Sequence, residues 1–576
     1  MRTPVPNVSQ PSLAQVRWKT PRTTTAPIAL CSARSQIIGV TAGSKSLQAN
    51  PEMPARTNVR GAAVSAATEG WGDEATAIAN AARSTRTTPL AGSRVGTSRR
   101  THRRTLRALM TSSTLTGRAT APVHVRLDGP MTDLRSTIAS TMPRVVADLQ
   151  RLIAIPSCAF PGFPAEPVLQ MADATVELLR RSGATGAKRL DVPGGYPVVY
   201  ADVPGPAGSP TVLLYAHYDV QPVPLQQGWT IDPWNPVVRD GRLYGRGAAD
   251  DKSGIAMHSA TLQAFGGQPP VHLKIVIEGE EETDSHLAAF AVANPDLFAA
   301  DVFVIADSGN DVVGHPILCT AMRGVAACTV QVRTLEQAVH SGLFGGVAPD
   351  ALVALIQMLA TLHDAAGNTI VSGLSSGGWH GAELSEALVR RMAGVREGVD
   401  LVGSGSVNTR LVSRPSATVI GIDAPPVSGA VNALVPVVRA TVSLRIPPGA
   451  NAQTELDCLT GHLQSVAPWN VEVTFDSPTI GEPFSTPSDG PALTAAKVAM
   501  ADAFGRSAEV SGSGGSIPLL NTLQQLSPGA EFIVWGAEDG ERANIHSADE
   551  SVSLVELEQA ALAQVLFLER LGAAPL

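Results

Sequence analysis

The amino-acid sequence predicts an α/β protein, and three observations support this fold class. Short apolar segments of strand length alternate with longer segments whose apolar residues recur at helical spacing, which is typical of an α/β sheet. His, Asp or Glu residues follow the apolar segments, at the end of the strand where open α/β folds bind their ligands. Hydrophobic residues make up 44% of the 576 residues, which is enough for a large buried core.

The first helix is expected at residues 132–153, where apolar side chains recur at helical spacing. Further helices are expected at 255–265 and 554–571 by the same criterion. Between and around them, four short apolar runs predict strands, at residues 197–203, 211–216, 273–277 and 302–306. No tandem repeat is apparent, which argues against a solenoid or a propeller.

The composition excludes several classes of protein. Only 16% of the residues are charged and 4% are aromatic, and the chain has 53 Gly and 43 Pro, which fits a globular enzyme better than a coiled coil or a nucleic-acid-binding protein. No apolar run reaches the roughly 18 residues that a membrane span needs. We therefore expect a soluble protein without a membrane partner.

Charge divides the chain near residue 130. The first 130 residues contain 18 basic and 5 acidic residues, a balance of +13, and the remainder carries −21. The basic segment is rich in Arg, Ser and Thr and poor in large apolar residues, which predicts disorder. An organellar transit peptide, a nucleic-acid-binding arm and translated sequence upstream of the true start remain open. The last is favoured because Met131 begins a good helix start, and because the acidic remainder would repel phosphates we expect no nucleic-acid partner.

The cysteines are few and widely spaced, which argues against a disulfide framework or a zinc knuckle. They are Cys31, Cys158, Cys319, Cys328 and Cys458. We expect buried thiols in a reducing, cytoplasmic setting.

The strand at 211–216 runs into His217 and Asp219. Side chains two positions apart share one face of a strand, so Asp219 can hold the imidazole of His217 from behind and fix its tautomer. A structural His is the commoner interpretation of such a pair on its own.

A glycine-bounded loop carries the adjacent carboxylates Asp250 and Asp251 just before the helix at 255–265. Plain capping of that helix is an alternative for the pair in isolation. The loop has neither of the glycine patterns that bind phosphate, so a phosphate-binding loop is rejected here.

Further acidic residues follow the next two strands, Glu278, Glu280, Glu281 and Glu282 after one and Asp307 after the other. Carboxylates crowded at the end of a buried strand need a positive charge to compensate them. His546 lies just before the last helix. Two His and several carboxylates without a ligand Cys suit divalent ions such as Zn, Mn or Co in a hydrolytic site.

Together these motifs resemble the dinuclear-metal metallopeptidase family that includes carnosinase, cytosolic nonspecific dipeptidase, carboxypeptidase G, acetylornithine deacetylase and succinyl-diaminopimelate desuccinylase. The resemblance extends from about Met131 to Leu576 and is strongest to the dipeptidase branch. It implies two divalent metal ions, most simply Zn, with this ligand set: His217 and Asp307 on one ion, Glu282 and His546 on the other, and Asp250 bridging both.

The resemblance also implies the roles of neighbouring residues. By this resemblance Glu281 would be the general base. Adjacent residues at a strand end point in different directions, which lets one glutamate ligate while the other faces the attacking water. Asp219 would hold His217 rather than bind metal. The peptide between Asp250 and Asp251 is expected to be cis.

The middle of the chain matches the lid and dimerisation domain of this family. His340 lies in a matching H-S-G turn and would reach across a homodimer to stabilise the oxyanion in the partner's site. Arg445 and its companion Asn432 would receive the substrate carboxylate, for which a planar guanidinium is suited. Gly515 and Ser516, in a G-G-S-I-P loop, would also meet the substrate.

One departure concerns Ser513, which stands where carnosinase-like members have an acidic residue. The loss of that acid puts recognition of a free substrate amino group in question. The sequence therefore predicts a metal-dependent dipeptidase acting on short peptides with a free C-terminal carboxylate, with an N-acyl-amino-acid amidohydrolase as the alternative. A noncatalytic relative is disfavoured because no metal ligand and no base is missing.

The expected organisation is a catalytic α/β domain with an inserted α+β lid. Residues 131–317 and 479–576 would form the catalytic domain, and residues 318–478 would form the lid. Residues 1–130 would precede both as the basic segment.

Overall fold

The structure is a computed structural model that describes residues 130–223 and 228–573. The described residues all belong to one compact unit. The predictions for the basic N-terminal segment and for Cys31 fall outside the described residues.

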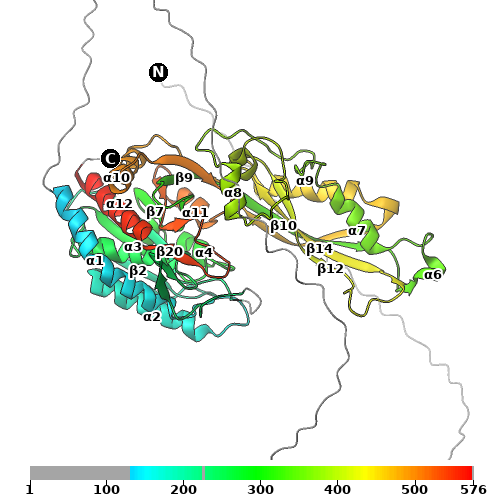
Figure 1. The fold of residues 1–576 in the computed structure, drawn as a ribbon, viewed down its shortest axis with the longest axis horizontal. Helices are drawn as coiled ribbons and strands as arrows, with labels where there is room; N and C mark the ends of the chain where they lie inside the picture. The colour runs from blue at the N-terminus through cyan, green and yellow to red at the C-terminus, as the bar shows by residue number, and fades with distance from the viewer. Residues whose placement is uncertain (1–129, 224–227, 574–576) are drawn as a thin grey trace, which may run out of the picture. The chain divides into compact units, whose positions relative to one another are not determined.

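A mixed sheet of nine strands forms the centre of this unit, in the order β1-β2-β6-β3-β7-β18-β9-β16, with β17 paired to β9 (Figure 1). The strands are β1 (Lys188–Leu190), β2 (Val198–Val203), β3 (Thr211–His217), β6 (His272–Glu278), β7 (Val302–Ile305), β9 (Ile317–Met322), β16 (Phe484–Ser485), β17 (Glu509–Ser513) and β18 (Glu531–Val534). Strands β6, β3, β7 and β18 run parallel to one another. The carboxyl ends of these four strands therefore meet at one edge of the sheet.

The predicted α/β fold class and the four predicted strands are confirmed, since the four apolar runs form β2, β3, β6 and β7. Strand β3 shows why these runs lack polar alternation. Its residues point alternately into two hydrophobic cores, with Leu214 in one core and Leu213 in the other, and both side chains are fully buried. A strand covered on both faces is apolar throughout.

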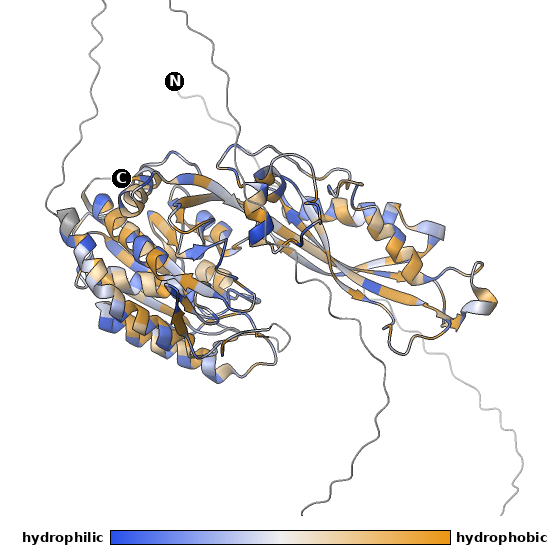
Figure 2. Cartoon of the chain, in the orientation of Figure 1, coloured by the Kyte–Doolittle hydropathy of each residue, from blue (hydrophilic) through white to orange (hydrophobic). Residues whose placement is uncertain are grey.

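Helices cover both faces of the sheet. One face packs against α1 (Pro130–Ile153), α2 (Ala165–Ser182), α3 (Lys252–Ala264), α10 (Pro491–Phe504) and α12 (Leu554–Ala573). The other face packs against α4 (Leu287–Ala293), α5 (Pro295–Phe298) and α11 (Leu519–Leu526). Figure 2 shows the strands as mostly hydrophobic and the helices as mixed, as expected when one side of each helix faces the core and the other faces water.

Two small sheets form outside the central one. The first consists of β4 (Val237–Arg239), β5 (Arg242–Tyr244) and β20 (Ser551–Ser553), and the second of β8 (Gly309–Asn310) and β19 (Glu538–Asp539). They join segments that are far apart in the sequence, because β5 pairs with β20 and β8 pairs with β19.

A separate antiparallel sheet of four strands is built from residues 324–481. Its order is β12 (Ser416–Asp423), β14 (Val437–Ile446), β10 (Gly324–Arg333) and β15 (Glu472–Gly481). Every second residue of β14 is buried, because one face packs on α7 (Ala351–Ala360) and α9 (Ala452–Ser465) and the other does not. The division of the chain at residues 318 and 478 stays a prediction.

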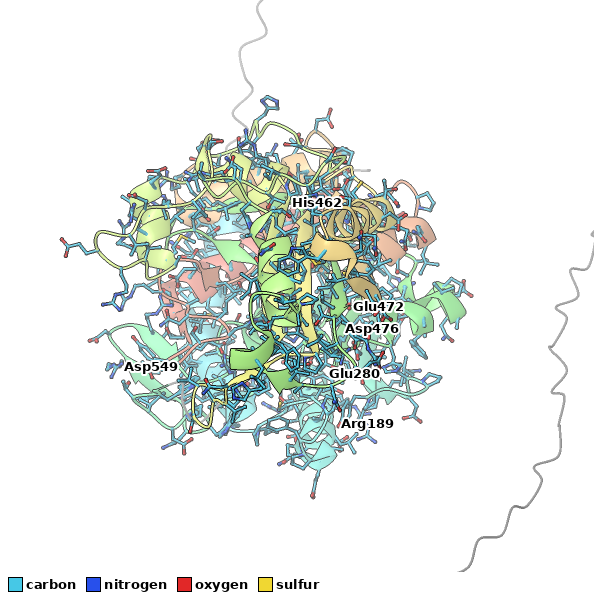
Figure 3. All side chains as sticks on the ribbon, turned by 90° about the vertical axis from the view of Figure 1, so that its right-hand side faces the viewer. Arg189, Glu280, His462, Glu472, Asp476 and Asp549 are labelled. Atoms are coloured by element: carbon cyan, nitrogen blue, oxygen red, sulfur yellow. The ribbon has the colours of Figure 1, made fainter. Side chains whose placement is uncertain are left out.

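Short elements connect this four-stranded sheet. A two-stranded ribbon of β11 (Val339–His340) and β13 (Ala433–Leu434) leads into α6 (Ser341–Phe344). The others are α8 (Glu386–Met392), the π-helical turn η1 (Thr409–Ser413) and the 3-10 turn η2 (Pro468–Asn470). Strand β15 lies at an edge of the sheet and carries Glu472 and Asp476 (Figure 3), and such charges discourage pairing with another strand.

Two further sequence expectations can be compared with the described residues. The four cysteines among them are free thiols, and Cys158, Cys319 and Cys328 are buried. None of the described helices combines the length and the apolar character needed to cross a membrane.

Candidate active site

The candidate site lies where the parallel strands end. His217 is the last residue of β3 and is paired in register with Glu278, the last residue of β6. Asp307 follows β7 by two positions. The strand ends at which polar residues occur in the sequence therefore meet at one edge of the sheet, because these strands are parallel.

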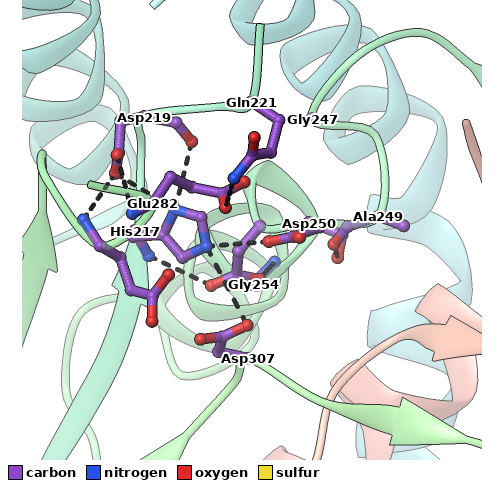
Figure 4. A network of polar contacts seen from close by, with 12 residues as sticks. His217, Asp219, Gln221, Gly247, Ala249, Asp250, Gly254, Glu282 and Asp307 are labelled. Carbon is purple, nitrogen blue, oxygen red and sulfur yellow. Dashed lines mark hydrogen bonds and ion pairs between the residues drawn. The ribbon is translucent and has the colours of Figure 1, made fainter. Parts of the chain in front are cut away.

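The imidazole of His217 is fully buried and lies between carboxylates on both sides (Figure 4). Its Nδ1 is 3.1 Å from the Asp219 carbonyl oxygen and 3.3 Å from the Asp219 carboxylate. Its Nε2 is 2.9 Å from Asp250 Oδ1 and 4.0 Å from Asp307 Oδ1. With Nδ1 turned to Asp219, Nε2 is the nitrogen that faces the cluster of carboxylates.

Asp219 also fixes the backbone of the two glutamates. Its two carboxylate oxygens accept hydrogen bonds from the amides of Glu281 and Glu282, each 3.1 Å long. One buried carboxylate thus contacts an imidazole and holds the turn that presents two further carboxylates.

The loop before α3 presents Asp250 at the centre of the site. The peptide between Asp250 and Asp251 is cis, as predicted. Asp251 does not point with Asp250, because it caps α3 by accepting the Gly254 amide at 3.1 Å and also accepts the His217 amide at 3.1 Å. The capping interpretation therefore holds for Asp251, whereas Asp250 is free to serve the site.

Glu550, just before β20, accepts hydrogen bonds from the loop that presents Asp250. Its Oε1 accepts the amides of Ala249 and Asp250 at 3.0 and 3.1 Å. Its Oε2 accepts the Gly247 amide at 3.0 Å and pairs with the Arg246 guanidinium at 2.6 Å. Both side chains of this ion pair are buried, so the loop is fixed by charge-assisted hydrogen bonds.

His546 and Glu282 lie on the other side of Asp250. His546 Nε2 is 2.9 Å from Asp250 Oδ2 and 3.1 Å from Glu282 Oε2. Gln221 donates to the same glutamate oxygen at 2.7 Å. Asp250 therefore has one oxygen toward His217 and the other toward His546, which is the arrangement of a bridging carboxylate.

The donor atoms form groups that suit divalent metal ions. Three groups each bring their potential ligand atoms within 4.8 Å of one another: His217 with Glu281 and Asp307, Asp250 with Glu282 and His546, and Asp250 with Asp307 and Glu538. Nitrogen and oxygen donors without a thiolate suit Zn, Mn or Co. The grouping brings all five residues of the predicted ligand set, together with Glu281, into one place.

Burial is the largest cause of the pKa shifts of the two carboxyl groups Glu281 and Asp307. It raises the pKa of Glu281 well above its usual value, with Asp307 as the next cause. Burial likewise raises the pKa of Asp307 to about 7. Hydrogen bonds to Asp250 and Glu282 raise the pKa of His546 to about 10. Crowded buried carboxylates and strongly basic imidazoles mark a place that favours positive charge.

The residues predicted to bind substrate fall into two places. Arg445, on β14, donates to Ser516 Oγ at 3.4 Å, and the Gly515 amide donates to Ser513 Oγ at 3.0 Å, so one Arg and the G-G-S loop come together. His340 and Asn432 lie side by side in the β11–β13 region, where the Ser341 amide donates to the Asn432 carbonyl at 3.0 Å. Both are exposed, and His340 Nδ1 accepts only the nearby Gly342 amide among the described residues.

Sequence reasoning missed Glu538, Glu550 and Arg323. Glu538 follows the apolar strand β18, so the rule that found Asp307 could have found it. Glu550 follows the identified His546 by four positions but carries no pattern of its own. Arg323 lies between β9 and β10, and its Nε donates to the Gly514 carbonyl at 3.3 Å, a contact that only the fold creates.

Comparisons with known proteins agree with this geometry. Residues 213–570 match the model of the peptidase family M20/M25/M40. The cysteinylglycine-S-conjugate dipeptidase of Corynebacterium striatum is 41% identical over 372 residues, which cover 63% of this chain and 82% of that protein. The Beta-Ala-His dipeptidase of Homo sapiens is 27% identical over 443 residues, which cover 71% of this chain and 86% of that protein.

Solved structures show the same fold. Human carnosine dipeptidase 1 superimposes with a TM-score of 0.67 at 24% identity, covering 77% of this chain and 99% of that one. The di-peptidase Dug1p from Saccharomyces cerevisiae superimposes with a TM-score of 0.65 at 22% identity, with the same coverage of 77% and 99%.

Proposed function

The chain belongs to the peptidase family M20/M25/M40, and from this membership we propose that it is a metal-dependent dipeptidase that hydrolyses short peptides with a free C-terminal carboxylate. The observation that carries the proposal is Asp250, whose two oxygens each lie 2.9 Å from an imidazole of the site. Relatives named as dipeptidases support the choice of substrate, since the Corynebacterium striatum protein is 41% identical.

Two divalent metal ions fit the donor set, and we propose Zn, with Mn or Co as alternatives. His217 and Asp307 would hold one ion, Glu282 and His546 the other, and Asp250 both. Metal ions in such a pair lower the pKa of water and polarise a carbonyl oxygen. Glu538 adds a further carboxylate beside Asp250 and Asp307.

Glu281 is the residue that we propose as the general base. It is grouped with His217 and Asp307, whereas His546 lies 3.1 Å from the neighbouring Glu282. We propose that its carboxylate takes a proton from the attacking water and returns it to the leaving amine. Arg445 with Ser516 would hold the carboxylate of the substrate, with Gly515 as a companion. Asn432, which lies beside His340 and not beside Arg445, would join this site from a second protomer.

His340 completes the proposal. It is exposed and makes only a local hydrogen bond among the described residues, so within one chain it serves no evident role. We propose a homodimer in which His340 of each protomer stabilises the oxyanion in the site of its partner. The reducing cytoplasm is the proposed location, in keeping with the free thiols of the described part.

Ser513 favours one alternative, an N-acyl-amino-acid amidohydrolase. Its Oγ accepts the Gly515 amide at 3.0 Å, and it offers no negative charge to a substrate ammonium group. The same metals and the same base would serve that reaction.

One experiment separates the two. The full chain, supplied with Zn or Mn, is assayed with unblocked dipeptides and with the same dipeptides N-acetylated. Cleavage of the unblocked peptides supports the dipeptidase. Preference for the acetylated ones would replace it with the amidohydrolase, and hydrolysis of neither would contradict both.

A further inference from the structure

Arg323 is a buried cation without an acidic partner in the described part of the chain. Only 8% of its surface is exposed. Its Nε donates to the Gly514 carbonyl at 3.3 Å and its amide donates to the Ser513 carbonyl at 3.2 Å, while its two terminal nitrogens have no protein acceptor among the described residues. A buried guanidinium without a carboxylate is costly unless a ligand supplies the negative charge.

The terminal nitrogens of Arg323 have space in front of them. Arg323 lines a cavity of about 680 Å³, a size that suits a small molecule or a substrate side chain. The wall contains Arg323, Arg410, Arg414 and His363 but no Asp or Glu. A terminal nitrogen of Arg410 pairs with Glu386 at 2.7 Å, and one of Arg414 donates to the Ser404 carbonyl at 2.7 Å. The terminal nitrogens of Arg323 differ from these, because they have no acceptor among the described residues.

The cavity borders the proposed carboxylate site on two sides. Arg323 contacts Gly514, which directly precedes the proposed substrate residues Gly515 and Ser516. Ser416, in the cavity wall, is paired in register with Arg445 across β12 and β14. Residues paired in this way have neighbouring side chains. The cavity therefore lies beside the place where the last residue of a bound peptide would lie.

The two guanidiniums exceed what one substrate carboxylate can neutralise. Arg445 makes no ion pair with a described carboxylate, and a terminal carboxylate would match it. Arg445 also lowers the pKa of Arg323, after the larger effect of burial, to about 10, which places the two cations close together. A second anionic group would satisfy Arg323 as the first satisfies Arg445.

We propose that this cavity receives the side chain of the substrate's C-terminal residue and that Arg323 selects an acidic side chain there. The enzyme would then favour dipeptides that end in aspartate or glutamate. This inference rests on the proposed function, because it takes Arg445 as the receptor of the terminal carboxylate.

The test compares Gly-Glu with Gly-Gln, which differ in charge but hardly in shape. We expect kcat/KM of the full-length enzyme to be about ten-fold or more higher for Gly-Glu, in keeping with a hydrogen-bonded charge pair. Arg323→Gln should bring that ratio close to one, and Arg323→Lys should retain part of it. Arg333→Gln is the matched control and should keep the ratio, because Arg333 is exposed, is paired with Glu336 and lies at the far end of β10, the strand that begins after Arg323.

Calorimetry of L-glutamate and L-glutamine with the same variants gives a readout that does not depend on turnover. Tighter binding of glutamate, lost in Arg323→Gln, supports the inference. Equal kcat/KM values for the two dipeptides would overturn it, as would an equal fall of both kcat/KM values in Arg323→Gln. Arg323 would then have only the structural role of holding the Gly514 loop. If the enzyme hydrolysed neither dipeptide, that result would contradict the proposed function. The binding of glutamate would then show by itself whether Arg323 binds an acidic side chain.

Discussion

Glu281 and Glu282 are adjacent in the sequence but have different partners. Glu282 contacts His546 and Gln221, whereas Glu281 lies with His217 and Asp307. The Asp219 carboxylate produces this separation by holding both backbone amides, so that successive side chains of the turn diverge. Because Glu281 is grouped with proposed metal ligands, it can be a general base or a ligand itself. The two roles predict different effects of a substitution on metal content.

For Glu281→Gln we expect a loss of kcat of about 10²-fold or more, the usual contribution of a general base, with metal content unchanged. Amide and carboxylate have the same shape, so the site should keep its geometry. Metal content by mass spectrometry and kcat on an unblocked dipeptide are measured together. A parallel loss of metal would show that Glu281 is a ligand, and Glu282→Gln provides that comparison.

His258 is a buried histidine that must stay neutral. Its Nε2 lies 3.1 Å from the Tyr215 carbonyl and so donates, and its Nδ1 lies 3.2 Å from the Gln564 amide nitrogen and so accepts. Burial lowers the pKa of His258 to about 4, although both hydrogen bonds oppose that shift. In the unfolded chain an imidazole titrates near its ordinary value of about 6.5.

Above pH 6.5 this histidine is neutral in both states and contributes no pH dependence. As the pH falls from 6.5 toward 4, the unfolded chain takes up a proton that the folded chain does not, and the free energy of unfolding falls by up to about 3 kcal/mol. Urea unfolding of wild type and His258→Gln at pH 7.5, 6 and 5 checks this. The variant should lose less stability on acidification, and parallel pH dependence would contradict the assignment.

The residues that sequence reasoning identified share a simple physical origin. His217, Glu282 and Asp307 follow apolar strands, and the parallel pairing of those strands brings their ends together. Glu550 could not be found in this way, because its importance arises from accepting amides of a loop about 300 positions earlier. Such contacts depend on the pairing of β5 with β20, which no local sequence pattern predicts.

At the scale of elements, the loop that presents Asp250 depends on the Arg246–Glu550 pair. Both side chains are buried, with exposed fractions of 1% and 0%. For Glu550→Gln we expect the free energy of unfolding to fall by about 3–5 kcal/mol, because the Arg246 guanidinium is left buried without its carboxylate. Chemical denaturation measures this, and metal affinity should fall with it because Asp250 is displaced.

An exposed ion pair provides the matched control. Arg391 and Glu541 lie 2.8 Å apart, with exposed fractions of 57% and 27%. Glu541→Gln should cost less than about 1 kcal/mol. Equal losses for Glu541→Gln and Glu550→Gln would contradict the role assigned to the buried pair.

The elements themselves were predictable to different degrees. Strands β2, β3, β6 and β7 could be read from apolar runs because helices cover both of their faces. The four-stranded sheet gave no comparable signal in the sequence. Strand β12 shows the reason, because most of its residues are exposed, including Val419, Ile420 and Ile422, so its apolar residues do not report a buried core.

At the scale of the whole molecule, the segment that follows His340 carries exposed apolar side chains. Leu343 and Val347 expose 76% and 90% of their surfaces, and Phe344 exposes 48%. All three follow the exposed His340 in the sequence, on α6 or just after it. Large apolar residues gathered on a surface favour an interface with another protein, which agrees with the proposed homodimer.

Mixing two inactive variants tests whether His340 acts across that dimer. Glu281→Gln and His340→Asn should each be nearly inactive alone. In a mixed dimer, the protomer with intact Glu281 receives His340 from its partner, so one of the two sites has both residues. Subunit exchange should then restore about a quarter of the wild-type activity, because about half of the dimers are mixed in a symmetric assembly. Activity that stays at the level of the separate variants, while exchange is verified by labelled subunits, would show that His340 does not act in the site of its partner.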